Sequence, residues 1–419
     1  MDIKYVCDLI DERAEELYDL LCQLIRVNSE SFGSTGNEQA CAEFIDGLCK
    51  ELNLQSEVYS PISLKDFEKN EDYYPGRHLE NRYNVSACWK GEEDVNGLQL
   101  MGHLDTVEIG DLENWDFPPL EGFVRDGNVW GRGACDDKYA LATVLFLIKL
   151  LQDAGFKPKK NLIFTAYCDE EHGGSHGAMA AVMKYPAERI VNMDGRQNQI
   201  WHCASGGQEV SYRYHTNKPA NSAEAAANAF PIVFDVINRF AQRRREELEN
   251  NRFYAGTNIP STSLRYKEVR AGNGGMDMGV GELEFVFYTD KTKEEIYSEF
   301  AAMERELSER LAPLDITGDG FIPTTRFFHY GFAEPDCQEI RDLVEAAKEA
   351  IGTDVLVCGS CLSDLSVILK YGGKHAFAFG AGRDFSLRGG AHQPNEYIEC
   401  DKLVDYSKMI AAYILRVLG

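Results

Sequence analysis

Three short apolar segments with strand character each run directly into acidic or histidine residues. In chain order these are residues 98–102 followed by His103 and Asp105, residues 162–168 followed by Glu170 and Glu171, and residues 190–193 followed by Asp194. Helical patterns lie between them, and strands that alternate with helices favour an α/β fold with a mixed, largely parallel sheet flanked by helices. The carboxyl ends of parallel strands meet at one edge of such a sheet, where these folds bind ligands. We therefore expect these side chains to cluster.

The pattern changes near residue 206, where Gly206 and Gly207 interrupt the chain. The segments that follow are a strand at 210–215, a helix at 222–250, strands at 263–270 and 282–288, and a helix at 293–310. None of them contains a member of the cluster, so we expect an inserted α+β lid domain. A chain of 419 residues exceeds one ordinary core. The predicted domains are a catalytic domain in two parts, residues 1–205 and 329–419, and the insert at 206–328.

Two further residues share the chemistry of the cluster. Asp136 stands in Gly-Arg-Gly-Ala-Cys-Asp-Asp-Lys and His392 in Gly-Gly-Ala-His-Gln-Pro-Asn-Glu. Imidazole nitrogen and carboxylate oxygen both bind zinc, and cobalt and manganese accept the same mixed donors. The sequence therefore predicts two divalent metal ions, with Zn²⁺ favoured. We expect Asp136 to bridge them, His103 and Asp194 to bind one, and Glu171 and His392 to bind the other.

Asp105 and Glu170 are predicted to act beside the metals. A histidine ligand usually donates its second ring nitrogen to a carboxylate, and Asp105 suits that role because residues i and i+2 of a strand share a face. Glu170 and Glu171 are adjacent, so their side chains diverge if the backbone is extended. One then binds metal, and the other, Glu170, is free to act as a general base on water. This equipment is suited to amide hydrolysis.

Charge and composition narrow the partners. The formal net charge of −25 argues against nucleic acid and anionic membrane surfaces, because both call for basic patches. The first residues lack the pattern of a signal peptide, and no apolar run approaches the roughly 18 residues of a membrane span. Twelve cysteines without an export signal are typical of free thiols in a reducing compartment, so we expect a cytoplasmic protein. A thiol or redox role for the cysteines is a further alternative.

Several of these motifs also resemble one family in the right order. They are Met101-Gly-His-Leu-Asp-Thr-Val107, Trp115, Pro118, Gly131-Arg-Gly-Ala-Cys-Asp-Asp-Lys138, Glu170-Glu171 and Gly390-Ala-His-Gln-Pro-Asn-Glu396. The chain is similar to the dinuclear-zinc aminoacylases and peptidases, which include acetylornithine deacetylase, succinyl-diaminopimelate desuccinylase, glutamate carboxypeptidase and bacterial dipeptidases. The resemblance implies a zinc aminopeptidase-like fold, a lid that often forms homodimers, and a cis peptide bond between Asp136 and Asp137. It agrees with the roles given above to the ligands and to Glu170.

The lid departs from the pattern of that family. Members carry a lid histidine and a lid-strand arginine, whereas this chain has Lys218 near the first position and Tyr288 near the second. His215 or Asn221 are candidates to replace the histidine. Arg383 and Arg388, shortly before His392, are candidates to bind the substrate carboxylate, although a solvated loop explains both arginines slightly better. Tyr139 also stands where the family has a glycine.

The sequence thus predicts a two-metal hydrolase of dipeptides or N-acyl amino acids. The complete ligand set together with Glu170 favours this function. The alternative is a catalytically impaired metal-bound scaffold or a small-ligand-binding protein, which the diverged lid favours. Two bound metals without hydrolysis across a broad substrate panel would distinguish the second from the first.

Overall fold

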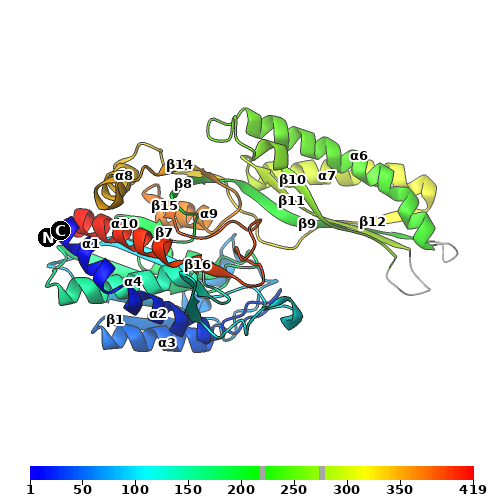
Figure 1. The fold of residues 1–419 in the computed structure, drawn as a ribbon. Coiled ribbons are helices and arrows are strands. Elements are labelled where there is room, and N and C mark those ends of the chain that lie inside the picture. The colour runs from blue at the N-terminus through cyan, green and yellow to red at the C-terminus, as the bar shows by residue number, and fades with distance from the viewer. Residues whose placement is uncertain (218–221, 273–278) are drawn as a thin grey trace. The chain divides into compact units, whose positions relative to one another are not determined.

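The chain forms two compact units. This computed structural model describes residues 1–217, 222–272 and 279–419 (Figure 1). The first unit consists of Met1–His202, Phe332–Cys358 and Val367–Gly419, and the second of Cys203–Gly331 and Gly359–Ser366. The sequence placed the boundaries at residues 206 and 328, and no pattern indicated that Gly359–Ser366 belongs with the second unit.

The secondary structure alternates as an α/β chain should. The helices are α1 (Ile3–Glu12), α2 (Ala14–Arg26), α3 (Gln39–Glu51), α4 (Lys138–Asp153), α5 (His176–Lys184), α6 (Ser222–Glu249), α7 (Lys293–Leu311), α8 (Gln338–Ile351), α9 (Leu365–Val367) and α10 (Cys400–Leu418). The strands are β1 (Gln55–Tyr59), β2 (Asn84–Trp89), β3 (Glu93–His103), β4 (Phe123–Arg125), β5 (Asn128–Trp130), β6 (Lys160–Tyr167), β7 (Ile190–Asn192), β8 (Gln199–Ala204), β9 (Gly206–Thr216), β10 (Leu264–Ala271), β11 (Val280–Thr289), β12 (Ile316–Pro323), β13 (Gly331–Phe332), β14 (Leu356–Ser360), β15 (Ala376–Phe379) and β16 (Tyr397–Glu399).

The main sheet brings the carboxyl ends of β3, β6 and β7 together. Its order is β1-β2-β6-β3-β7-β15-β8-β13 among the described residues, with β14 paired to β8. β3 runs parallel to both β6 and β7, and β15 runs parallel to β7, whereas β1, β2 and β8 pair antiparallel. His103 pairs with Tyr167 and Met101 pairs with Asn192. The predicted mixed, largely parallel sheet is confirmed, and the residues that follow these three strands emerge at one edge.

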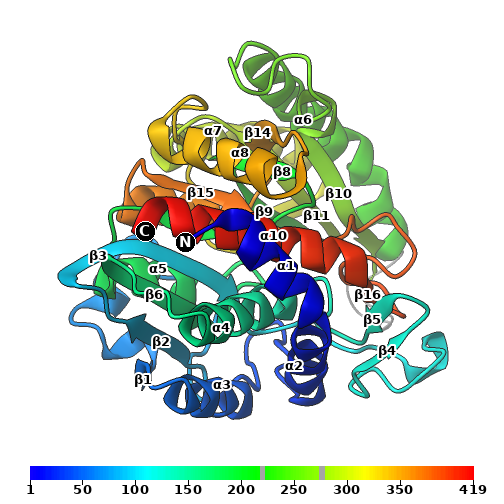
Figure 2. The same ribbon diagram turned by 60° about the vertical axis from the view of Figure 1, so that its left-hand side comes forward.

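Helices with broad apolar faces cover this sheet. In α4, thirteen of sixteen residues are buried, and the apolar run Leu141–Leu151 predicted this helix. Figure 2 shows α4 and α10 on the near side of the sheet, with α1 and α2 beside them. Each fully buried leucine or valine there contributes about 1.5–3 kcal/mol relative to an exposed one. This packing gives a rigid base for the loops at the carboxyl edge.

A small sheet of order β16-β5-β4 places two distant loops beside each other. Tyr397 of β16 pairs with Trp130 of β5, and the amide of Gly131 donates to the carbonyl of Glu396 at 2.9 Å. The loop that follows β5 contains Asp136, and the loop that precedes β16 contains His392. The small sheet therefore carries His392 to the residues at the edge of the main sheet.

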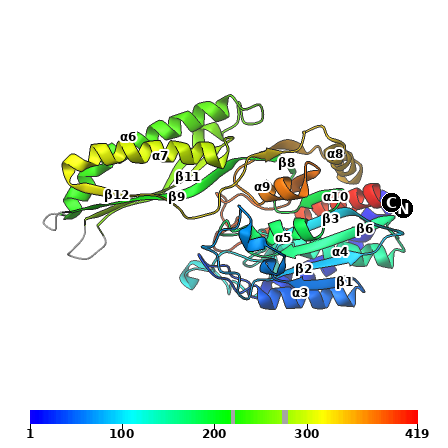
Figure 3. The same cartoon turned by 180° about the vertical axis from the view of Figure 1, so that it is seen from behind.

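The second unit is an antiparallel sheet covered by two helices. Its strand order is β10-β11-β9-β12, and α6 and α7 lie together on one face (Figure 3). Val210, Tyr212 and Tyr214 alternate along β9 into an apolar core that both helices complete. The sequence anticipated each of these elements except β12, where half of the residues are exposed and burial shows no regular alternation.

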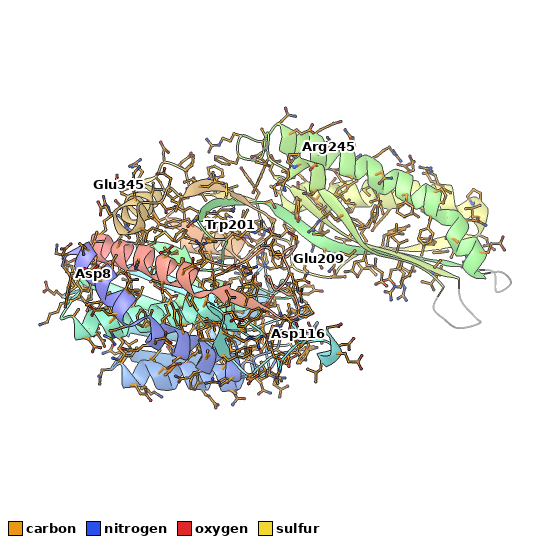
Figure 4. The ribbon with its side chains drawn as sticks, viewed as in Figure 1. Asp8, Asp116, Trp201, Glu209, Arg245 and Glu345 are labelled. Carbon is orange, nitrogen blue, oxygen red and sulfur yellow. The ribbon has the colours of Figure 1, made fainter. Side chains whose placement is uncertain are left out.

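Charged side chains dominate the surface. Asp8 on α1, Arg245 on α6 and Glu345 on α8 lie on the exposed sides of their helices (Figure 4). No helix among the described residues has both the length and the apolar character that crossing a membrane requires. All twelve cysteines are free thiols.

Candidate functional site

Asp136 lies between two histidines that come from distant parts of the first unit. His103 is the last residue of β3, and its Nε2 is 3.0 Å from Oδ1 of Asp136. His392 lies in the loop before β16, and its Nε2 is 3.2 Å from Oδ2 of the same carboxylate. Each oxygen of Asp136 thus faces a different imidazole. The peptide bond from Asp136 to Asp137 is cis, as the family resemblance implied.

Glu171 and Asp194 join this group. Oε2 of Glu171 is 2.7 Å from Nε2 of His392, and its Oε1 accepts the amide of Val107 at 2.9 Å. One ligand atom each from His103, Asp136 and Glu171 lie within 4.8 Å of one another. Asp194 follows β7, and burial together with the charges of Asp136 and Glu171 raises its pKa to about 7. The structure therefore brings His103, Asp136, Glu171 and His392 into contact, and Asp194 lies near enough for its charge to interact with theirs.

The electrostatics of the group favour a bound cation. Burial alone would lower the pKa of His103, but its hydrogen bond to Asp136 and the charge of Glu170 raise that pKa well above its usual range. Burial would also lower the pKa of His392. The charge of the Glu171 carboxylate, together with hydrogen bonds to Asp136 and Glu171, outweighs burial and raises that pKa to about 11. Carboxylates packed this closely repel one another unless a proton or a cation lies between them. Nitrogen and oxygen donors in this number fit zinc or a related divalent ion.

Asp105 has a different contact from the one predicted. Its carboxylate accepts the amides of Glu170, at 3.0 and 3.2 Å, and of Glu171, at 3.2 Å. Nδ1 of His103 lies 2.8 Å from the backbone carbonyl of Asp105 and 3.7 Å from its carboxylate. The prediction assumed that β3 continues to Asp105, but the strand ends at His103, so the two side chains do not share a strand face. Asp105 instead holds the backbone of the acidic pair.

Glu396 has a role that the sequence motif did not reveal. Its carboxylate pairs with Nη1 of Arg132 at 2.7 Å and accepts the amides of Gly133 at 3.1 Å and Cys135 at 2.9 Å. Both charged side chains are almost completely buried. Glu396 therefore fixes the loop that presents Asp136 to the loop that presents His392. The only sequence signal was its place at the end of the His392 motif.

Tyr139 fixes the backbone around Asp194. Its hydroxyl donates to the carbonyl of Met193 at 2.7 Å and accepts the amide of Ala381 at 2.9 Å. The side chain is buried at the start of α4, directly after the Asp136 loop. The residue that departs from the family pattern thus links β7 to the segment after β15.

Two of the predicted substrate contacts are engaged elsewhere in the first unit. Arg383 forms an ion pair with Glu399, and its guanidinium lies 3.9 Å from the centre of the Tyr397 ring. The side chain of Arg388 is 90% exposed, and Asp116, at 3.8 Å, is its nearest carboxylate. The solvated-loop interpretation fits Arg388, Arg383 is paired with Glu399, and both arginines stay predictions as substrate contacts.

The two lid candidates come from the inserted segment of the chain. His215 belongs to the second unit, where its Nδ1 is 3.0 Å from Oδ1 of Asp319. Asn221 lies outside the described residues. Tyr288, at the approximate position of the lid arginine, accepts a hydrogen bond from Arg265 at 2.9 Å. These residues therefore stay predictions as substrate contacts.

The α/β sheet carries a cluster of nitrogen and oxygen donors at its carboxyl edge, an arrangement that suits a metal-dependent hydrolase. Residues 99–416 match the peptidase family M20/M25/M40, and the chain belongs to this family. It is 24% identical to an uncharacterised metallohydrolase of Methanocaldococcus jannaschii, over 94% of this chain and 98% of that protein.

Solved structures share the fold. The dipeptidase Dug1p of Saccharomyces cerevisiae superposes with a TM-score of 0.75 at 14% identity, covering 99% of this chain and 98% of that one. A dinuclear metal binding peptidase of family M20 from Bacillus subtilis has a TM-score of 0.59 at 16% identity, covering 97% and 99%. At these identities the likeness shows the fold alone.

Proposed function

We propose that this chain is a two-metal amidohydrolase that cleaves a dipeptide or an N-acyl amino acid with water. The observation that carries the proposal is the Asp136 carboxylate, whose two oxygens face the ring nitrogens of His103 and His392 at 3.0 and 3.2 Å. A carboxylate in this arrangement is suited to bridge two cations. Membership of the peptidase family supports an amide substrate, and the yeast structural relative is itself a dipeptidase.

The ligands divide into two sets that share Asp136. His103 and Asp194 would hold one ion, and Glu171 and His392 would hold the other. Donors limited to nitrogen and oxygen suit Zn²⁺, and they also accept Co²⁺ or Mn²⁺. When bound, these ions supply Lewis acidity, which polarises an amide carbonyl and lowers the pKa of water.

Glu170 is the residue to which we assign the proton transfers. Its carboxylate takes a proton from water as the water oxygen bonds to the amide carbon. It then delivers that proton to the amide nitrogen as the carbon–nitrogen bond breaks, which leaves a carboxylic acid, a free amine and Glu170 unchanged. The acid then gives its proton to the amine, so the final products are a carboxylate and an ammonium group. Two features support this role: its charge reaches the His103 ring, and Asp105 holds its backbone amide.

The test compares two isosteric variants of neighbouring residues. Glu170→Gln should lower kcat by about 10²–10⁴-fold on dipeptides or N-acyl amino acids and keep the metal content of the wild type. Glu171→Gln should lose metal, because an amide replaces a ligand oxygen. Turnover is measured across a substrate panel, and metal content by elemental analysis of the purified protein.

The outcomes separate the base from the metal site. Unchanged turnover in Glu170→Gln would overturn the assignment of the base. Two metals per chain with no hydrolysis of any substrate in the panel would favour the alternative, a metal-bound scaffold or ligand-binding protein. Failure of the wild type to bind metal would overturn both interpretations.

A further inference from the structure

Asp169, the residue before the acidic pair, is held by three buried cationic or ring side chains. Its Oδ1 accepts from Nε of Arg77 at 2.7 Å and from Nη1 of Arg82. Its Oδ2 lies 2.5 Å from Nδ1 of His176, the first residue of α5. All four side chains are at most 1% exposed. We name these four residues the Asp169 clamp.

The two arginines are themselves anchored on the far side. Both donate to the hydroxyl of Ser31, at 2.8 and 2.7 Å, and Arg82 also donates to the carbonyl of Thr35 at 2.6 Å. Oε1 of Glu38 lies 3.2 Å from Nε of Arg82. Burial of a guanidinium costs several kcal/mol unless it is paired and hydrogen-bonded, so this arrangement is stable only while Asp169 is present.

The clamp determines a constrained backbone turn. Asp169 has a φ of 66°, in the left-handed region that non-glycine residues rarely occupy. Its carbonyl accepts the amide of Ser175 at 2.8 Å, which closes the turn. A Cβ at Gly174 would lie 1.9 Å from Oδ2 of Asp169, so the close approach requires glycine there. The turn therefore depends on the Asp169 carboxylate being held where it is.

The acidic pair is consequently held from two sides. Asp105 accepts both of its backbone amides, and the clamp fixes the residue that precedes it. Because Glu170 and Glu171 are neighbours in one turn, a rotation of the Asp169 backbone would redirect both of their carboxylates. A displacement of about 1 Å at reacting groups can cost about 100-fold in rate.

We infer that the Asp169 clamp is a positioning device that sets the directions of the Glu170 and Glu171 carboxylates. The inference rests on the hydrolase function proposed above. Arg77, Arg82, His176 and Asp169 act through the acidic pair and are positioning residues. None of them is a proposed metal ligand or takes part in the proton transfers. A positioning role explains why three cationic or ring side chains are buried around Asp169.

The experiment uses Asp169→Asn, which keeps the shape of the side chain and removes its charge. We expect kcat to fall by at least about tenfold while KM stays within about twofold, because substrate contacts are unchanged and only the proton-transfer geometry is lost. Hydrogen–deuterium exchange of a peptide spanning residues 168–175 should also accelerate, because the backbone amides of Glu170 and Glu171, which donate to Asp105, become less protected. Arg77→Lys, which keeps the charge but loses the fork of donors, should give an intermediate loss of kcat.

Asp342→Asn is the matched control. Asp342 is also buried and accepts from two arginines, Arg189 at 2.5 Å and Arg416 at 3.4 Å, but it lies on α8. It should lower thermal stability and leave kcat within about twofold.

Each outcome addresses a separate proposal. The positioning role would be overturned if Asp169→Asn keeps the kcat and the exchange rate of the wild type. It would also be overturned if Asp342→Asn loses as much kcat as Asp169→Asn. If Asp169→Asn exchanges faster at residues 168–175 but the wild type hydrolyses no substrate, the positioning role stands and the proposed function is overturned. If Asp169→Asn does not fold, Arg77→Lys decides by the same two readouts.

Discussion

Glu396 and Arg132 form a buried ion pair at 2.7 Å although 264 residues separate them in the chain. This pair joins the loop of Asp136 to the loop of His392. Mutation of residues that orient metal ligands without touching the metal typically lowers metal affinity by about 10–100-fold. Glu396 and Arg132 are such residues if Asp136 and His392 bind metal.

Glu396→Gln should therefore weaken zinc binding by about 10–100-fold. Glu396 accepts the amides of Gly133 and Cys135 on different oxygens, so a glutamine can accept only one of the two, and it no longer balances the charge of Arg132. Calorimetric titration of metal into the metal-depleted protein measures the effect. Glu399→Gln, which removes the neighbouring partner of Arg383, is the control and should bind zinc like the wild type. Equal affinities in both variants would contradict this role for Glu396.

Asp136→Asn should reduce the zinc content from two ions to one or none per chain. An asparagine offers one oxygen in place of two, so it cannot face both histidines with ligand atoms. The proteins are loaded with zinc and then dialysed to remove unbound metal, and elemental analysis gives the number of zinc ions per chain. Asp126→Asn serves as the control, because Asp126 is exposed and has a φ of 52° that asparagine tolerates. Two ions retained in Asp136→Asn would exclude a bridging role.

Tyr139→Phe should destabilise the first unit by about 1–3 kcal/mol, because the buried amide of Ala381 loses its acceptor. The ring itself still fills its place in the core. Chemical denaturation followed by a probe in the first unit tests this expectation. Tyr5→Phe, at a residue that is half exposed, should change stability by less than about 0.5 kcal/mol. Indistinguishable curves for the two variants would show that the hydroxyl of Tyr139 contributes nothing.

The second unit should lose stability as the pH rises from about 4.5 to about 7 through Glu247. Burial raises the pKa of this carboxyl to about 7, although Thr289, Arg244 and the amide of Asp290 oppose the shift. Between these pH values the folded state binds the proton and the unfolded state does not, so the free energy of unfolding falls as the pH increases.

Glu247→Gln should flatten that dependence. A glutamine oxygen can still accept from the hydroxyl of Thr289 and from the amide of Asp290, both at 2.6 Å in the wild type, and Arg244 keeps Glu299 as a partner at 2.8 Å. Thermal unfolding of the second unit at pH 5 and pH 7.5 makes the comparison. An identical pH slope in wild type and variant would mean that other groups cause the dependence.

Much of the fold could be predicted because its signals are local. The apolar run of α4 and the alternating pattern of β9 each lie within one short stretch of sequence. The parallel strands at the edge that carries the site follow from the alternation of strands and helices along the chain. The first turn of α5 was not predicted, because Gly173 and Gly174 precede it and His176 looks like part of a loop. The left-handed Ser175 that begins this helix has no sequence pattern of its own.

The site divides in the same way. The proposed ligands have side chains that bind metal ions, so His103, Asp136 and Glu171 could be named as candidates before their geometry was known. The contacts of Arg77 and Arg82 could not, because a charged residue in a polar segment is buried only when a distant partner, here Asp169, compensates its charge. The contacts of Asp105 with the amides of Glu170 and Glu171 could not be predicted for a related reason, since they depend on the strand ending at His103, two residues before it.

The distance in sequence between His392 and the other ligands has a consequence for synthesis on the ribosome. Most of the second unit, Cys203–Gly331, is synthesised after His103, Asp136, Glu171 and Asp194 but before His392. Domains generally fold as units during translation, so the nascent chain carries a half-built donor set past an entire second folding event. Chains released before residue 392 would present the acidic half of the centre without the imidazole that Glu171 contacts.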